Sequence, residues 1–126
     1  MIIPFALEKK QTILVAGCGG GYDVVSAGLP IGLALEKLGH RVIYASYSFT
    51  NIAAVDPAHR MSIPDTSPGS ITLPVNKDTA IPQTYFPEKY MAQWYYQELG
   101  KDILMYCYTG HGTRSMASTF NHLKKL

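Results

Sequence analysis

Three short apolar runs stand out in the pattern of hydrophobic and polar positions. They are residues 12–16 (TILVA), 41–46 (RVIYAS) and 103–107 (ILMYC). Apolar runs of this length without polar alternation are typical of strands that are covered on both faces, as in parallel sheets. The first run leads into a glycine-rich segment, and the third leads into a second glycine-containing turn at 109–113. The pattern therefore predicts three buried parallel strands.

A longer apolar stretch, residues 24–38, lies between the first two predicted strands and ends at Gly39, a residue that commonly ends helices. Pro30 disrupts any helix that carries it in its interior. Either the helix kinks there, or a short turn after Asp23 gives way to a helix that begins near Pro30. In both cases strand, helix and strand form a βαβ unit, and its crossover is expected to be right-handed.

Two further segments, residues 87–99 and 115–126, have helical spacing of their apolar positions. The first begins with a proline and is followed by Gly100, which favours a helix with defined ends. The spaced positions are Met91, Trp94, Tyr95 and Leu99 in the first segment, and Met116, Phe120 and Leu123 in the second. Each helix is expected to turn this face inward.

Residues 49–86 show no helical repeat. Five of the eight prolines of the chain fall here, at positions 57, 64, 68, 74 and 82. Because a structureless loop of this length is unusual inside a compact domain, one or two short strands are expected, near Met61–Ile63 and Ile71–Leu73. The proline-rich segment 50–85 is otherwise predicted to be a mobile flap.

These elements predict an α/β fold, a Rossmann-like parallel sheet with flanking helices, in a single domain over residues 1–126. Parallel strands need cover on both faces, and the predicted helices barely supply it. The strand at 103–107 would have a neighbour on one side only, unless the proline-rich segment folds back to pair with it. We therefore expect an incomplete, truncated domain, the N-terminal part of a larger one, that self-associates or exposes an unpaired sheet edge.

Composition narrows the classes of function. The 126 residues are 47% hydrophobic, and 11 basic against 9 acidic residues give a net charge of +2. The basic residues are scattered, which argues against a surface for nucleic acid or anionic membranes. No segment has the apolar length that spans a bilayer, and the N-terminus lacks the charge order of a secretory signal. Two cysteines do not make a disulfide framework, so both are expected to be reduced thiols of a cytoplasmic protein.

The first glycine-rich segment is a candidate ligand site. Its glycines, between a predicted strand and a predicted helix, are Gly17, Gly19, Gly20 and Gly21. Glycines at such a place let backbone N–H groups approach an anion and direct a helix N-terminus at it. A tight turn without a ligand is the alternative, although four glycines in five residues exceed what a turn requires.

The segment departs from two familiar phosphate-binding motifs. Tyr22 stands where the dinucleotide motif needs its last glycine, and residues 44–48, at the end of the second predicted strand, contain no carboxylate. The lysine and hydroxyl residue of the Walker motif are also missing. Asp23 would repel a bare phosphate. It could instead cap the helix, accept a hydrogen bond from a ribose or other sugar hydroxyl, or help to hold a metal.

Several blocks resemble one known family. Residues 15–25 (VAGCGGGYDVV), 28–31 (GLPI), 45–50 (ASYSFT) and 85–90 (YFPEKY), with Trp94 one turn later, are similar to the family called domain of unknown function 1152, found in bacteria and archaea. The resemblance implies a Rossmann-like fold and no established activity. It also implies that the natural domain continues beyond residue 126, into another strand with an acidic, glycine-rich turn.

The second glycine-containing turn follows a cysteine. Residues 107–115 read CYTGHGTRS. A cysteine at a strand end, then a loop of N–H groups and an arginine, is how rhodanese and cysteine-phosphatase sites stabilise a thiolate. Six residues separate Cys107 from Arg114, one more than in the phosphatases, and no aspartate acid is evident. The other interpretation is an inert buried cysteine, which is common in proteins.

Gly110, His111, Gly112 and Arg114 complete the candidate ligand-binding residues. His111 is expected to be exposed, where it could bind an anion, transfer protons or serve only as a turn residue. Arg114 could clamp an anion. The remaining histidines have no metal-ligand spacing, so no metal is proposed. Four aromatic residues just beyond strand ends could stack on a ligand ring, although packing is their commoner role; they are Tyr22, Tyr47, Phe49 and Tyr108.

Ligands of open α/β sheets bind beyond the carboxyl ends of the strands, and both glycine segments are expected there. This favours one site built from residues 17–23 and 110–114. Three functions stay open. The first is binding of a small anionic or nucleotide-like metabolite, with or without a reaction. The second is sulfur or phosphate transfer through Cys107, and the third is a non-catalytic half-domain that acts with a partner chain. The sequence identifies no cofactor.

Overall fold

The structure is a computed structural model that describes residues 9–80 and 85–126. Four strands form one sheet: β1 (Thr12–Gly20), β2 (Arg41–Ser48), β3 (Ile71–Val75) and β4 (Met105–Thr109). Their order across the sheet is β1-β2-β4-β3. The first three strands in that order are parallel, and β3 runs antiparallel to β4 at the edge. The carboxyl ends of β1, β2 and β4 therefore lie at one edge of the sheet.

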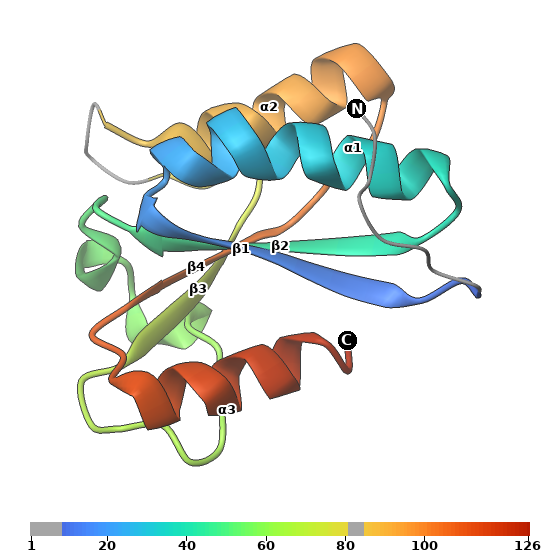
Figure 1. Cartoon of the computed structure of the whole chain (residues 1–126). Helices are drawn as coiled ribbons and strands as arrows, with labels where there is room; N and C mark the ends of the chain where they lie inside the picture. The colour runs from blue at the N-terminus through green and yellow to red at the C-terminus, as the bar shows by residue number, and fades with distance from the viewer. Residues whose placement is uncertain (1–8, 81–84) are drawn as a thin grey trace.

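Helices cover both faces of this sheet. Helices α1 (Leu29–Lys37) and α2 (Pro87–Leu99) lie on one face, and α3 (Thr113–Leu123) lies on the other (Figure 1). The α/β fold with a mostly parallel sheet and flanking helices, as the sequence predicts, is confirmed. No helix among residues 9–80 and 85–126 is long and apolar enough to cross a membrane.

Successive strand residues point to opposite faces, so the sheet divides the core into two clusters. Tyr44 and Cys107 belong to the larger cluster, with Tyr95 of α2, whereas their neighbours Ala45 and Tyr108 pack with Leu123 of α3. The apolar runs predicted to be covered on both faces are therefore covered by different helices on the two sides.

Strand β1 is longer than predicted, because the glycine run continues the strand instead of forming a loop after it. Gly17 pairs with Ser46 and Gly20 with Ser48, and the register shifts between these two pairs. An irregularity of this kind adds twist and is favoured by glycine. The boundary predicted at residue 16 is thus wrong, since pairing to β2 supports backbone that has no strand propensity of its own.

The segment after β1 matches the second alternative posed by Pro30, a short turn that gives way to a helix beginning near the proline. Helix α1 begins at Leu29 with Pro30 in its first turn, and a π-helical turn, η1 (Val24–Gly28), precedes it. The Leu29 N–H donates to the carbonyl of Val24. A wider turn accommodates the proline ring and its missing N–H, so the chain stays helical without breaking.

The proline-rich segment supplies the edge strand β3. The strand predicted near Ile71–Leu73 is confirmed, whereas Met61–Ile63 is not a strand and donates one hydrogen bond, from the Met61 N–H to the Thr72 carbonyl at 2.8 Å. Strand β4 lies between β2 and β3. The prediction of an unpaired sheet edge beside this strand is therefore wrong. The reason for expecting self-association at that edge no longer holds.

The segment before β3 contains two 3₁₀ turns, η2 (Ile52–Ala54) and η3 (Pro57–His59). Its predicted mobility stays a prediction, and residues 81–84 of the segment lie outside the described residues. Strand β4 covers residues 105–109 instead of the predicted 103–107, because pairing with β2 and β3 begins only at Met105.

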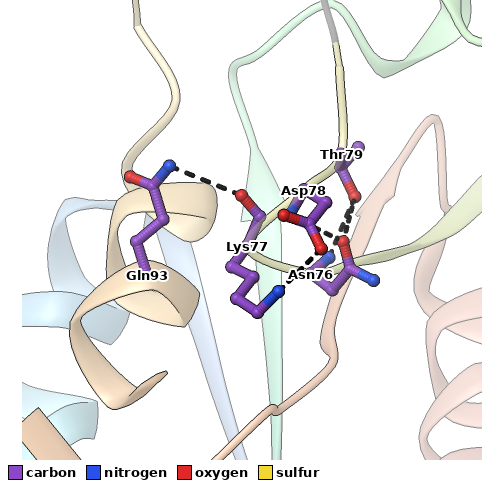
Figure 2. A network of polar contacts seen from close by, with 5 residues as sticks. All are labelled: Asn76, Lys77, Asp78, Thr79 and Gln93. Atoms are coloured by element: carbon purple, nitrogen blue, oxygen red, sulfur yellow. Dashed lines mark hydrogen bonds and ion pairs between the residues drawn. The ribbon is translucent and has the colours of Figure 1, made fainter. Parts of the chain in front are cut away.

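A tight turn after β3 is fastened to α2. The side chain of Asn76 accepts hydrogen bonds from the Asp78 N–H at 2.9 Å and from the Thr79 hydroxyl at 3.3 Å. Gln93 of α2 donates to the Lys77 carbonyl at 3.4 Å, as Figure 2 shows. These bonds hold the antiparallel edge against the helix that precedes β4.

A chain of hydroxyl and carboxyl groups joins α1, α2 and β2. The Tyr44 and Tyr95 hydroxyls lie 2.5 Å apart, and the Tyr95 hydroxyl donates to Glu36 of α1 at 3.3 Å. Tyr44 approaches α1 at Gly32, where a Cβ atom would overlap the phenol. Burial raises the pKa of Tyr44 to about 12, so its hydroxyl keeps its proton near neutral pH.

We expect Gly32→Ala to destabilise the protein by about 1–3 kcal/mol, the usual cost of overpacking, although alanine favours helix more than glycine does. Urea unfolding measures the change. Gly112→Ala is the matched control, because a Cβ at Gly112 meets no atom within 4 Å. Equal stability of the two variants would contradict the tight contact at Gly32.

Candidate functional site

The glycine run of β1 packs against side chains of the protein itself. A Cβ at Gly17 would lie 2.8 Å from Oδ1 of Asp23, and one at Gly21 would lie 2.9 Å from Oε1 of Glu88. At Gly20 it would overlap the ring of Phe49. Gly20 and Gly21 also have positive φ angles of 79° and 99°, which favour glycine. Close packing and backbone conformation therefore require these glycines before any ligand is considered.

The side chain of Asp23 lies at the glycine run, where the sequence predicts that an anion binds. Its Oδ2 atom accepts the backbone N–H of Cys18 at 2.5 Å. Its side chain makes no capping hydrogen bond to the helix that follows, so the capping role considered for it is not found. The chain's own carboxylate thus uses a backbone donor of the glycine run, and a free anion would have to displace it.

Two carboxyl oxygens at this edge are buried without a hydrogen-bond partner among the described residues. They are Oδ1 of Asp23 and Oε2 of Glu88. Glu88 is fully buried in the first turn of α2, and its other oxygen accepts the Ser46 hydroxyl at 2.9 Å. Buried carboxyl oxygens nearly always have a partner, so the site is rich in acceptors and lacks donors.

Burial raises the pKa of Glu88 above its ordinary value. Hydrogen bonds from its own backbone N–H, Ser46 and Ser48 lower it, and the charge of nearby Asp23 raises it further. Glu88 is therefore a group whose proton is held more tightly in the folded state than in the unfolded state. Such a group reduces the free energy of unfolding as pH rises from its unfolded pKa through its folded pKa.

We expect Glu88→Gln to remove this pH dependence. The variant should gain stability relative to the wild type as pH rises above about 4.5, the ordinary value, by about 1.4 kcal/mol for each unit of raised pKa. Thermal and urea unfolding between pH 4 and 8 measure the difference. Glu98→Gln, an exposed position on the same helix, serves as the control. A difference that stays constant with pH would rule out a raised pKa.

The second glycine segment lies at the same edge, on the face of the sheet that α3 covers. His111 is half-buried, not exposed as predicted: its ring lies 2.8 Å from the Thr109 carbonyl and 3.3 Å from the Thr72 hydroxyl. Burial lowers the pKa of His111. Gly112 and Arg114 are exposed at the start of α3, and Gly110, with φ of 71°, lies against the Gly69 carbonyl.

Tyr108 connects the two glycine segments. Its hydroxyl donates to the Gly17 carbonyl at 3.1 Å, and its ring packs against His111 with centroids 5.6 Å apart. The segments thus share one edge with a buried phenol between them, while Asp23 and Glu88 lie toward α1 and α2. Of the four aromatic residues predicted to lie beyond strand ends, Tyr47 and Tyr108 lie inside β2 and β4, and Tyr108 belongs to the core. Tyr22 and Phe49 do follow strand ends, and both are exposed.

Cys107 is an unsuitable nucleophile in this structure. It is fully buried, and burial raises its pKa well above the ordinary value, with a further contribution from Glu88. Its thiol lies 3.9 Å from the Met105 carbonyl. A thiolate needs an electropositive, accessible setting, so these contacts favour the inert interpretation over rhodanese- or phosphatase-like chemistry.

The two cysteines allow this to be tested within one molecule. Cys18 is exposed and Cys107 is buried. We expect a disulfide reagent at neutral pH to label one thiol per folded chain quickly and the second only after unfolding. Cys18→Ser should abolish the fast phase. Fast labelling of Cys107 in that variant would reopen the thiol chemistry.

A separate hollow lies against β3, the edge strand furthest from β1. Its volume is about 400 Å³. It is lined by Ala54, Val55, Asp56, His59, Leu73, Pro74, Asp78, Thr79 and Ala80. Asp78 belongs to the turn of Figure 2, where it pairs with Lys77 at 2.7 Å. Across residues 9–80 and 85–126, no three histidine, cysteine or acidic side chains come together to hold a metal ion.

No family model, curated protein or solved structure matches the chain. The resemblance to the domain of unknown function 1152 family therefore stays a hypothesis carried by the quoted sequence blocks. What the site can do has to be inferred from its own contacts.

Sequence reasoning missed Glu88 and Ser46. An acidic residue in the first turn of a helix is ordinarily an exposed partner of the helix dipole, so nothing local marks Glu88 as buried. Ser46 belongs to a segment of β2 that contains no acidic residue. The carboxyl group beside it is that of Glu88, which belongs to α2. Only the packing of α2 against β2 brings these two residues together.

Proposed function

We propose that this protein binds a small nucleotide-like metabolite at the carboxyl ends of β1 and β2, and that it holds the ligand by hydroxyl groups. The observation that carries the proposal is the hydrogen bonding of Asp23. One carboxylate oxygen accepts the Cys18 N–H, and the other is buried without a partner among residues 9–80 and 85–126. A buried acceptor that lacks a hydrogen-bond partner can gain one from a ligand that carries a donor group. A sugar hydroxyl is such a donor.

The position of Asp23 supports this use. The carboxylate lies over Gly17 and Gly19 at the edge where open α/β sheets bind ligands. Gly19 and Cys18 are exposed, so the carboxylate sits just beneath the protein surface and not in the core. A ligand that lies along the glycine run would reach it after a small movement of the side chain.

The same geometry disfavours a bare anion. A phosphate at the glycine run would compete with Asp23 for the Cys18 N–H and would also face its negative charge. A neutral hydroxyl meets neither obstacle. Of the ligands that the sequence leaves open, the sugar part of a nucleotide-like molecule is therefore favoured over its phosphate.

Substitution of Asp23 separates the two modes. Asp23→Asn keeps the shape and removes the charge, so we expect binding of adenosine and of ribose to weaken about tenfold, the effect of losing one hydrogen bond to a charged group. Calorimetry and ligand-observed NMR measure the change. Asp102→Asn, at an exposed residue that precedes β4, is the control. If Asp23→Asn instead creates tight binding of inorganic phosphate and leaves adenosine unaffected, the site is an anion site.

A further inference from the structure

The two edges of the sheet differ in how open they are to further pairing. At the β3 edge, the Thr72 carbonyl already accepts the Met61 N–H at 2.8 Å, and Pro74, which faces the same way, has no N–H. A covering segment and a proline are two of the ways in which proteins protect an edge strand from pairing with another chain. At the opposite edge, β1 has no strand on its outer side in the parts of the chain that the structure describes. Extension of the sheet is therefore expected at β1.

Every second residue of β1 directs its backbone groups away from β2. The Gln11 carbonyl accepts the Arg41 N–H at 2.9 Å, so Gln11 faces β2. The N–H and C=O groups of successive strand residues point to alternate sides, and the register with β2 is unbroken over residues 12–17. The residues whose N–H and C=O groups face the open edge are therefore Thr12, Leu14 and Ala16.

The side chains along this edge are those of a covered strand. Residues 12–16 include no charge and no proline, yet each of them is partly exposed, whereas residues 43–46 of the neighbouring β2 are buried. Leu14 packs with the core cluster on the α3 side of the sheet, and Val15 packs with the cluster on the other side. An apolar edge strand with free backbone groups is a template for pairing with another chain. The edge therefore favours an extended protein strand over a small ligand.

This edge is complementary to itself. Its outward-facing residues are symmetric around Leu14, and so are the charges at its two ends. Lys10 is exposed four positions before Leu14, and the Asp23 carboxylate accepts the N–H of Cys18, four positions after Leu14. In an antiparallel pair of β1 strands, Lys10 of each copy therefore lies opposite the contact between Cys18 and Asp23 of the other. Opposite charges that face each other across two strands stabilise such a pair.

We propose that β1 pairs antiparallel with β1 of a second copy of this chain, around a two-fold axis at Leu14, so that the sheets of the two copies form one continuous sheet. Thr12 of each copy then exchanges hydrogen bonds with Ala16 of the other, and Leu14 with Leu14. The axis also places Ile13 opposite Val15, an apolar pair on the other face of the sheet. The contact is isologous and closes at two copies, because the β3 edge is protected. This dimer goes beyond the proposed function and does not depend on a ligand.

Sedimentation velocity of the full chain over a range of concentrations tests the dimer. Thr12→Pro removes an N–H that β2 does not accept, so the fold should survive while the dissociation constant of the dimer rises about tenfold or more. Thr12→Lys, which places a charge on the same edge, should have a similar effect and decides the test if the proline variant does not fold. Thr12→Val keeps the N–H and the shape of the side chain, so this control should dimerise as the wild type does. Urea unfolding shows which variants are folded.

Disulfide trapping tests the register, in a Cys18→Ser background whose one remaining cysteine, Cys107, is buried. Across the proposed axis the two Leu14 Cα atoms lie about 5.5 Å apart, within disulfide range, so Leu14→Cys should form a covalent dimer on mild oxidation. The two Ile13 positions are diagonal neighbours about 7–8 Å apart, so Ile13→Cys should cross-link about tenfold more slowly.

A wild type that stays monomeric at about 0.1 mM would overturn the proposal and leave the β1 edge to a strand from a different polypeptide. A dimer that the folded Thr12 variants do not weaken would overturn it as well, since the contact would then lie on another surface. Equal cross-linking of Leu14→Cys and Ile13→Cys, or none of either in a dimeric protein, would reject the antiparallel alignment around Leu14.

Discussion

The glycine run at the end of β1 has no side chains, and the packing at the carboxyl edge of the sheet depends on this. Asp23 arrives from the turn after β1, Phe49 from the end of β2 and Glu88 from the first turn of α2, and all three contact glycine positions. A Cβ atom at these positions would meet those side chains at 2.9 Å or less at Gly17, Gly20 and Gly21. Glycine alone lets the backbone come so close, so a short stretch of strand determines how three other segments meet.

The same contacts set the chemistry of the edge. The run offers backbone donors, and the protein's own carboxylate already takes the one at Cys18. Glu88 is buried at the start of a helix, where the field of the helix favours the charged acid and burial favours the neutral one, and burial prevails. This edge combines buried carboxyl acceptors with exposed aromatic rings, whereas a glycine-rich segment usually indicates a set of backbone donors for a phosphate.

Local sequence patterns were sufficient to predict most of the helices and strands, but they did not predict the contacts between them. Strand β2 follows from an apolar run that is covered on both faces, and helix α2 follows from helical spacing, although Trp94 and Leu99 of its predicted inner face are exposed. The extent of β1 depends on pairing with β2, which glycine propensity cannot indicate, and β4 begins two residues late because its partners begin there. The bond between Ser46 and Glu88 joins residues 42 positions apart, so no local signal foretells it. His111 lies in a loop as predicted, but its partial burial was missed for the same reason, since Thr72, which lies beside it, comes from another strand.

The order of the strands has a consequence for how the protein is made. β4 is the last of the four strands in sequence, yet it lies between β2 and β3. During synthesis β1 and β2 can pair as soon as both have left the ribosome, whereas β3 has no partner in the sheet until residues 105–109 emerge. During that interval the edge of β2 that later pairs with β4, and the whole of β3, have unpaired backbone N–H and C=O groups that other chains can bind. The sheet can be completed only when β4, one of its two interior strands, has left the ribosome.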